Sequence, residues 1–178
     1  MNLKEKYQKE VLKAMREKFG YKNNLAVPRI LKVVLNVGIG RAKDDPKVME
    51  VAENTLIRIS SQKPVAKRAK KSISAFKVRQ GMPVGLMVTL RGQRMWDFLT
   101  KLVAIALPRV RDFRGLEPKS IDQQGSLNIG FQEHLVFPEI KSDEVEKIHG
   151  LEVAIATSAK SQKEGLELFK LLGFPFQS

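Results

Sequence analysis

Hydrophobic residues recur along the chain with two different periods, which predict where helices and strands lie. Apolar residues three to five positions apart indicate amphipathic helices. The helix predicted at residues 94–107 is apolar on most sides, as expected of a helix in the centre of the core. A fourth helix starts with a capping box at Ser161–Glu164 and stops at Gly173. Asp45 is typical of an N-cap for the second helix. The first three predicted helices span residues 3–19, 46–60 and 94–107.

Strict alternation of apolar and other residues predicts four strands, because successive side chains of a strand point to opposite faces. One face of the sheet is then apolar and needs cover from the helices. The other face is polar and basic, and a long basic loop lies beside it. Within this loop, Val65-Ala66 and residues 73–78 are candidates for short strands, and residues 77–83 fit either the tip of a long hairpin or an ordinary exposed turn. We therefore predict a single α+β domain over residues 1–178, with a mostly antiparallel sheet and helices on one face. The predicted strands cover residues 29–37, 84–91, 127–131 and 151–157.

Basic residues are concentrated in one segment of the chain. The sequence has 32 basic and 19 acidic residues and a formal net charge of +13. Residues 54–96 contain ten of the basic residues and no acidic residue. So dense a block of positive charges repels itself unless a polyanion neutralises it, which indicates a phosphate-binding surface. The alternative is a basic face that is simply solvated. We call these ten residues the basic window: Arg58, Lys63, Lys67, Arg68, Lys70, Lys71, Lys77, Arg79, Arg91 and Arg94.

The residues around the basic window favour RNA as the polyanion. The polar face of the predicted sheet offers Lys32, Asn36 and Thr89 but no aromatic residue, so it lacks the stacking platform that binds single strands. No helix presents a basic face for the major groove of DNA. The pattern predicts recognition of a folded, double-helical RNA by its shape and backbone. Phe76, the one aromatic residue of the loop, could belong to the core or to the surface. The cluster Lys67–Lys71 also matches the pattern of a nuclear localisation signal, which is weak evidence on its own.

No motif predicts an enzyme. Gly38-Ile39-Gly40 lacks the third glycine of a dinucleotide fingerprint, and no serine lies in a nucleophile elbow. His134 in a polar turn and His149 at a helix end lack metal-ligand spacing, and the chain has no cysteine. The acidic residues 139–146 are typical of a solvated helix face. We expect no catalytic residue, cofactor or metal, and with no signal or membrane segment we expect a cytoplasmic protein without a membrane partner.

Seven short motifs, in this order, resemble the bacterial family of ribosomal large-subunit protein five. The resemblance covers essentially the whole chain, although Ser60-Ser61 stands where the family has Thr-Gly and residues 122–125 replace a more basic turn. The motifs are Leu35–Gly40, Gln62–Pro64, Lys70–Ile73 followed by Phe76–Arg79, Val88–Gly92, Asp112–Leu116, Phe137–Ile140 and Leu172–Phe176.

The resemblance implies a structural protein that binds 5S ribosomal RNA and helps to anchor it in the central protuberance of the large subunit. It also implies that the protein is monomeric when free and that 23S ribosomal RNA is a further partner. It implies a loop near transfer RNA in the peptidyl site and a bridge to a small-subunit ribosomal protein, which residues 133–139 also face. A free-standing RNA chaperone is the rival. The expected RNA-binding residues are Lys32, Asn36, Gln62, Lys63, Lys67, Arg68, Lys70, Lys71, Thr89 and Arg91; those near transfer RNA are Phe76, Lys77, Val78, Arg79, Gln80, Gly81 and Met82; those of the bridge are Arg109, Arg111, Asp112 and Arg114.

Overall fold

The computed structural model describes residues 2–40, 46–141 and 148–177. Its internal contacts divide the chain into two compact units. Unit 1 comprises Met1–Val33, Leu90–Ile129 and Val153–Ser178, and unit 2 comprises Val34–Thr89 and Gly130–Glu152. Each boundary between the units falls within a strand. The single domain over residues 1–178 stays a prediction.

Five strands form one sheet in the order β2-β3-β1-β5-β4. The predicted α+β fold with a mostly antiparallel sheet is confirmed. The fifth strand, β2, lies in the basic loop and includes Val65-Ala66, which the sequence offered as a candidate short strand. The strands are β1 (Ile30–Gly38), β2 (Val65–Arg68), β3 (Pro83–Leu90), β4 (Leu127–Phe131) and β5 (Leu151–Thr157).

The alternation in the sequence corresponds to one buried and one outward face of the sheet. Leu35 and Val37 of β1 and Val153 of β5 are at most 1% exposed. The residues that alternate with them along each strand are partly or fully exposed. The start of β1 departs from the prediction, since Ile30 is buried and Leu31 is 41% exposed. The outward face is therefore available to a ligand along most of each strand.

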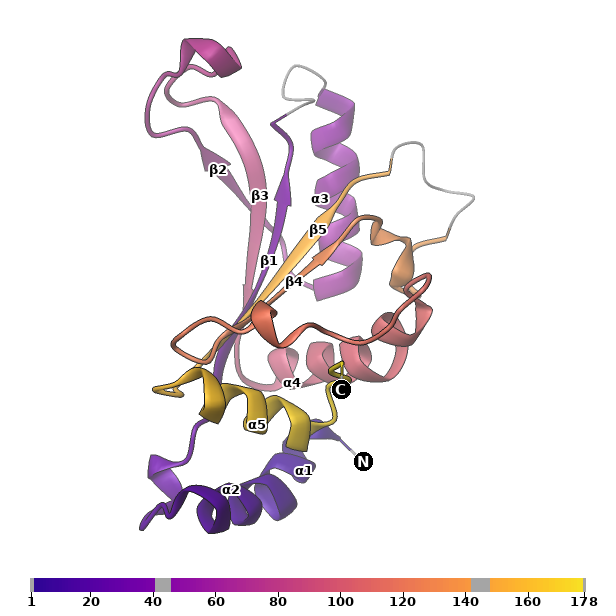
Figure 1. Cartoon of the computed structure of the whole chain (residues 1–178). Coiled ribbons are helices and arrows are strands. Elements are labelled where there is room, and N and C mark those ends of the chain that lie inside the picture. Colours follow the sequence, from indigo (N-terminus) through magenta and orange to yellow (C-terminus); the bar gives the residue numbers. More distant parts are fainter. Residues whose placement is uncertain (1, 41–45, 142–147, 178) are drawn as a thin grey trace. The chain divides into compact units, whose positions relative to one another are not determined.

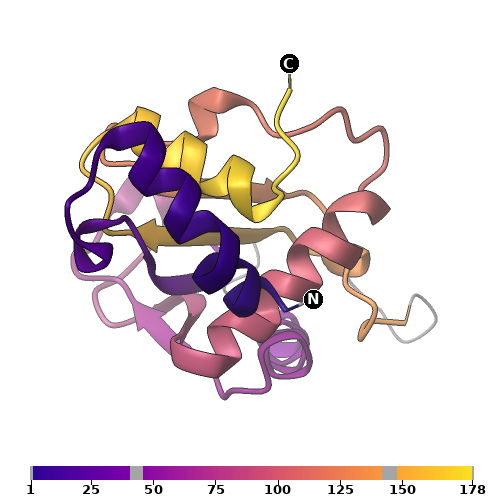
Figure 2. The ribbon, with the colours of Figure 1, turned by 90° about the horizontal axis from the view of Figure 1, so that it is seen from below.

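Unit 1 contains the N-terminal, central and C-terminal helices (Figure 2). Two of them include a π turn, where the hydrogen bonds span one residue more than in an α-helix. In the first helix, buried or half-buried residues recur every four positions from Leu3 to Phe19. Strict four-residue spacing drifts around an α-helix by about 40° per step, so one wider turn realigns the apolar face. The helical segments are α1 (Leu3–Lys6), η1 (Tyr7–Val11), α2 (Leu12–Phe19), α4 (Gly92–Lys101), η4 (Leu102–Ala106), η5 (Leu107–Arg109) and α5 (Gln162–Leu172).

Unit 2 contains the helix α3 (Pro46–Ser60), which buries Ala52, Leu56 and Ile59. Its predicted N-cap, Asp45, lies outside the described residues. Within the parts of the chain that the structure covers, no helix is long and apolar enough to cross a membrane. Short 3-10 helices connect the elements of both units: η2 (Asn24–Ala26), η3 (Ser74–Phe76), η6 (Pro118–Ser120) and η7 (His134–Val136).

Two glycines of unit 1 allow the turn before β4 to lie against α5. Gly125 has φ +80° and contacts Gly165 of α5 through its backbone. A Cβ placed on Gly165 would lie 2.5 Å from the Cα of Gly125 and even nearer to its carbonyl oxygen. The turn is also tied to β5, because the Thr157 hydroxyl donates to the Gly125 oxygen at 2.8 Å. Both positions therefore need glycine for close backbone packing.

Candidate nucleic-acid interface

The basic loop predicted from the sequence is an ordered hairpin that extends β2 and β3 (Figure 1). Beyond the strands, the Ala69 N–H donates to the Met82 oxygen at 2.8 Å, and the Gly81 N–H donates to the Ala69 oxygen at 2.9 Å. Farther out, Ile73 and Val78 form an antiparallel bridge. This backbone ladder holds the basic side chains of the hairpin in a defined order along two arms.

The tip of the hairpin is centred on the 3-10 turn Ser74–Phe76, earlier in the chain than the sequence indicated. Residues 78–82 form the returning arm, where the Gln80 N–H donates to the Ser72 hydroxyl at 2.9 Å. Phe76 is 70% exposed, so the loop's aromatic residue belongs to the surface and not to the core. The hairpin therefore ends in an apolar, exposed ring above basic arms.

All ten side chains of the basic window are exposed. Eight of them have no carboxylate within ion-pair distance in the described part of the chain, so their charge is not compensated internally, and six of these lie on the hairpin or directly before it. A cluster of uncompensated cations on a two-stranded arm produces a strong local positive potential. The six are Lys63, Lys67, Arg68, Lys70, Lys71 and Arg79.

The polar residues singled out on the sheet lie on the outward face of unit 2. The Gln62 side chain donates from Nε2 to the Thr89 backbone oxygen at 3.3 Å, which joins these two predicted residues. Asn36 on β1 is partly exposed and donates from Nδ2 to the Glu152 carboxylate at 3.4 Å. Sequence reasoning overlooked Glu152, although the alternation of β5 already placed it on this face. The exposed Glu152 carboxylate orients the Asn36 side chain. The amide oxygen of Asn36 then remains available to accept a hydrogen bond from another donor.

The other predicted site residues lie in unit 1. Lys32 is partly exposed on β1, and Arg91 is exposed as the residue before α4. The four predicted bridge residues, Arg109, Arg111, Asp112 and Arg114, are all exposed.

The predicted bridge segment is followed by residues that a later part of the chain holds in place. The Leu116 N–H donates to the Pro175 oxygen at 2.7 Å, and the Gln177 N–H donates to the Leu116 oxygen at 3.0 Å. Gly115 has φ +100°, and a Cβ there would lie 2.9 Å from the Gln177 nitrogen. This parallel backbone pairing of Leu116 with Phe176 fixes where the segment returns to the core of unit 1.

Three described residues other than glycine have a left-handed backbone: Ser61, Lys77 and Asp112, with φ of +53°, +50° and +52°. Each lies within a predicted site or directly beside one. Ser61 precedes Gln62, Lys77 ends the hairpin tip, and Asp112 belongs to the bridge segment. Such backbone conformations are uncommon for residues with a Cβ and concentrate at functional sites. Serine at position 61 thus adopts the conformation for which glycine is suited.

His134 and His149 form a stacked pair that the sequence did not predict. Their ring centroids are 3.9 Å apart at an interplanar angle of 9°. His134 is fully buried, contrary to the expected polar turn, and its Nδ1 lies 3.1 Å from the His149 backbone oxygen. His149 is in no described helix, and Glu139 lies in a turn instead of on a helix face. The other acids of the predicted helix face, at positions 143, 144 and 146, lie outside the described residues.

The stacked pair predicts that unit 2 loses stability on acidification. Burial lowers the pKa of both imidazoles below about 6.5, their value in an unfolded chain. The unfolded state therefore takes up more protons, and stability should decrease as the pH falls below about 6.5. Thermal unfolding followed between about pH 7.5 and about pH 5.5 measures this loss. The double variant His134→Gln/His149→Gln should show a flatter dependence; an unchanged slope would contradict the assignment.

Comparison with known proteins accounts for the whole chain. Residues 23–79 match the family described as ribosomal protein L5, and residues 83–176 match the model described as the C-terminus of that ribosomal family. Three relatives share the name large ribosomal subunit protein uL5. That of Halothermothrix orenii is 54% identical over 98% of this chain and 97% of its own. That of Caldanaerobacter subterraneus is 55% identical over the same shares.

The relative from Chloroflexus aurantiacus is 52% identical, over 99% of this chain and 98% of its own. Identity at this level extends over 98% of the chain or more in each of these relatives. The prediction of a non-enzymatic structural protein is confirmed by the family. The ordered motifs, the antiparallel sheet and these matches agree that the chain belongs to the ribosomal protein L5 family.

Proposed function

We propose that the chain binds 5S ribosomal RNA and anchors it in the central protuberance of the large subunit. Membership of its family makes the chain a structural constituent of the large ribosomal subunit in the cytoplasm. The observation that carries the finer proposal is the hairpin of unit 2, where six exposed cations, on the hairpin or directly before it, have no carboxylate within ion-pair distance among the described residues. Lys63, Lys67, Arg68, Lys70 and Lys71 supply phosphate contacts that position the RNA.

The outward face of the sheet supplies the contacts that distinguish one RNA from another. Asn36, Gln62 and Thr89 present amide and hydroxyl groups next to the hairpin in the same unit. Such groups hydrogen-bond to ribose 2′-hydroxyls and base edges in the shallow minor groove of an RNA helix. The described residues of this face include no aromatic side chain, which favours a double-helical target over a single strand.

Two further contacts belong to the proposal. The exposed Phe76 at the hairpin tip faces transfer RNA in the peptidyl site, with residues 77–82 beside it. The segment 109–114, whose charged residues are exposed, and the segment 133–139 face a small-subunit ribosomal protein. Arg109, Arg111 and Arg114 suit an acidic partner surface, because arginine forms paired hydrogen bonds with carboxylates.

Replacing Asn36 or Thr89 by alanine tests the sheet face directly. Each change should weaken binding to 5S ribosomal RNA by about 1–3 kcal/mol, since a buried polar partner on the RNA is left unpaired. Equilibrium binding is measured against 5S ribosomal RNA and against a random RNA duplex at the same salt concentration. Affinity for the random duplex should not change, because that binding depends on phosphates alone.

Asn128→Ala is the matched control, because Asn128 is an exposed asparagine on the outward face of β4 that the proposed site does not include. Normal 5S binding by both Asn36→Ala and Thr89→Ala, with the fold intact, would remove the sheet face from the site. Equal affinity of the unaltered protein for 5S ribosomal RNA and for the random duplex would favour an RNA chaperone instead.

Deleting the hairpin tip separates the proposed transfer-RNA contact from 5S binding. When the tip residues 74–77 are replaced by Asn-Gly, the protein keeps the backbone ladder of the hairpin and the phosphate contacts of β2, so its affinity for 5S ribosomal RNA should stay within about threefold. Subunits carrying it should bind peptidyl-site transfer RNA less tightly and translate more slowly. A filter-binding assay and a translation assay measure the two effects. A large loss of 5S binding would show that the tip belongs to the 5S site.

A further inference from the structure

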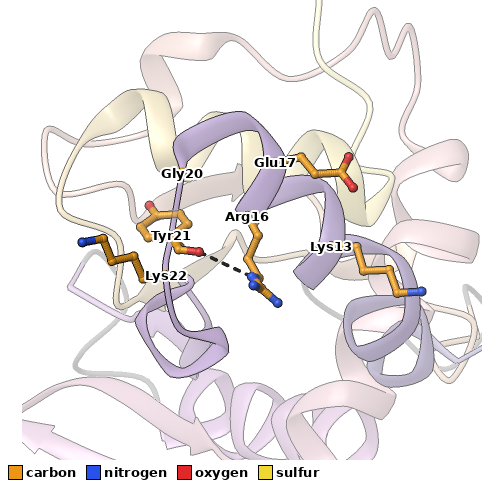
Figure 3. Close-up of a pocket in the computed structure, with 6 residues that line it drawn as sticks. All are labelled: Lys13, Arg16, Glu17, Gly20, Tyr21 and Lys22. Atoms are coloured by element: carbon orange, nitrogen blue, oxygen red, sulfur yellow. Dashed lines mark hydrogen bonds between the residues drawn. The ribbon is translucent and has the colours of Figure 1, made fainter.

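A second concentration of positive charge lies in the N-terminal part of unit 1, apart in sequence from the basic window. Residues 2–33 contain nine basic and three acidic residues. An open pocket of about 430 Å³ lies here, lined by Lys13, Arg16, Glu17, Gly20, Tyr21 and Lys22 (Figure 3). The residues are contributed by the last turns of α2 and by the loop that follows. Three cations and one carboxylate thus share a single concave surface.

Arg16 is held in position by neutral groups. Its Nη1 donates to the Asn24 side-chain oxygen at 2.9 Å, and its Nε donates to the Tyr21 backbone oxygen at 3.4 Å. Neither acceptor is charged, so the guanidinium is oriented while its positive charge stays uncompensated. An arginine ordered in advance loses less entropy when it forms paired hydrogen bonds with a phosphate.

Lys13 and Lys22 lie on either side of Arg16, and neither they nor Arg16 is ion-paired within the described residues (Figure 3). Lys18, by contrast, is paired with Glu167 at 2.7 Å and is not part of the pocket. The cations of the pocket therefore keep an uncompensated charge, whereas the charge of the neighbouring Lys18 is neutralised by Glu167. This arrangement leaves a net positive charge on the pocket.

The three cations that attract an anion, Lys13, Arg16 and Lys22, outnumber the two carboxylates that oppose it, Glu17 in the pocket and Glu164 beside Tyr21. Glu17 lines the pocket but points away from the Arg16 guanidinium (Figure 3). The carbonyl end of α2 contributes a partial negative charge that acts within its last turn. Tyr21 adds no charge, because burial and the neighbouring Glu164 carboxylate raise its pKa to about 12.

We propose that the Lys13–Arg16–Lys22 pocket is a phosphodiester-binding site, a second ribosomal RNA contact separate from the hairpin and the sheet face. The proposal rests on the proposed function, because it takes the anion to be RNA. The pocket is open and suits one exposed backbone phosphate, held by Arg16 and flanked by the two lysines. It binds by charge and reads no base, so it strengthens attachment to RNA without adding sequence specificity.

The test compares the double variant Lys13→Gln/Lys22→Gln with the control Lys119→Gln/Lys170→Gln. The control removes the same charge from exposed lysines of unit 1 that do not line the pocket. Neither Lys13 nor Lys22 forms a described side-chain hydrogen bond, so the fold should be retained, which thermal unfolding verifies. Binding of the full chain is measured to protein-free large-subunit RNA, 5S and 23S together, over a range of salt concentrations.

The double variant should bind roughly tenfold more weakly than the control, and its dependence of log affinity on log salt should be less steep by about one. An identical affinity and slope for the two variants would overturn the proposal. That result would leave the proposed function intact if Asn36→Ala still weakens binding to 5S ribosomal RNA. Normal 5S binding by Asn36→Ala and Thr89→Ala, with a defect in the double variant, would instead contradict the proposed sheet site and support the pocket.

Discussion

The affinity of the chain for 5S ribosomal RNA is expected to fall about 10³- to 10⁵-fold when monovalent salt is raised from about 50 to about 200 mM. The reason is the hairpin, where cations such as Lys67, Arg68 and Lys70 are exposed without internal counter-charges among the described residues. Each phosphate that they neutralise releases condensed counterions, and added salt opposes that release. Roughly six to ten phosphate contacts produce a loss of this size.

Equilibrium titrations at several salt concentrations measure the slope, and the variant Lys67→Gln/Lys70→Gln provides an internal comparison. Each lysine removed from a phosphate contact should lower the slope by about one. Asn36→Ala should weaken binding with the slope unchanged, because an amide releases no counterions. A flat salt response of the unaltered protein would exclude phosphate binding as the main source of affinity.

Replacing Gly165 by alanine is expected to destabilise unit 1 by about 3 kcal/mol or more. Alanine inside a helix is normally favoured over glycine by about 1 kcal/mol, so helix propensity alone predicts the opposite sign. The close approach to Gly125 decides the outcome, since the new Cβ would meet its Cα at 2.5 Å and its carbonyl. These are backbone atoms that cannot turn aside as a flexible side chain would.

Thermal unfolding should show a decrease in Tm of roughly 6–12 °C for a chain of this length. Gly130→Ala is the matched control, because a Cβ there meets nothing within 4 Å and Gly130 has no positive φ. It should leave Tm within about 2 °C of the parent value. An equal or higher Tm for Gly165→Ala would mean that the turn before β4 moves away from α5 at little cost.

The elements of the fold were predictable because their signals are local. Alternation at Leu35 and Val37 or at Leu127 and Ile129 reflects only which face of a strand is buried, and the helices end at glycines with left-handed backbones, as at Gly173. The basic window was equally visible, because net charge needs no knowledge of contacts. These features follow from composition and spacing within a few residues.

Features that depend on contacts between distant residues were not predictable from the sequence. His134 and His149 are fifteen positions apart, and no local period signals that their rings stack. Gly165 resembles any glycine in a helix until Gly125 is placed against it. The pairing of Ala69 with Gly81 was also hidden, since neither residue carries a strand pattern, and the sequence placed the hairpin tip too late in the chain. Asn36 and Thr89 were found because the alternation places them on the outward face of their strands, where they are polar.

The parallel bridge between Leu116 and Phe176 has a consequence for the order in which the protein matures. Translation produces residues 109–116 well before Pro175 and Gln177, the partners that hold Leu116. Until those partners leave the ribosome, the nascent chain carries the arginine-rich segment without its anchor. Proteolysis of stalled chains should therefore cut this segment readily before residues 175–177 emerge and poorly afterwards, which makes its protection a marker that these residues have docked on Leu116.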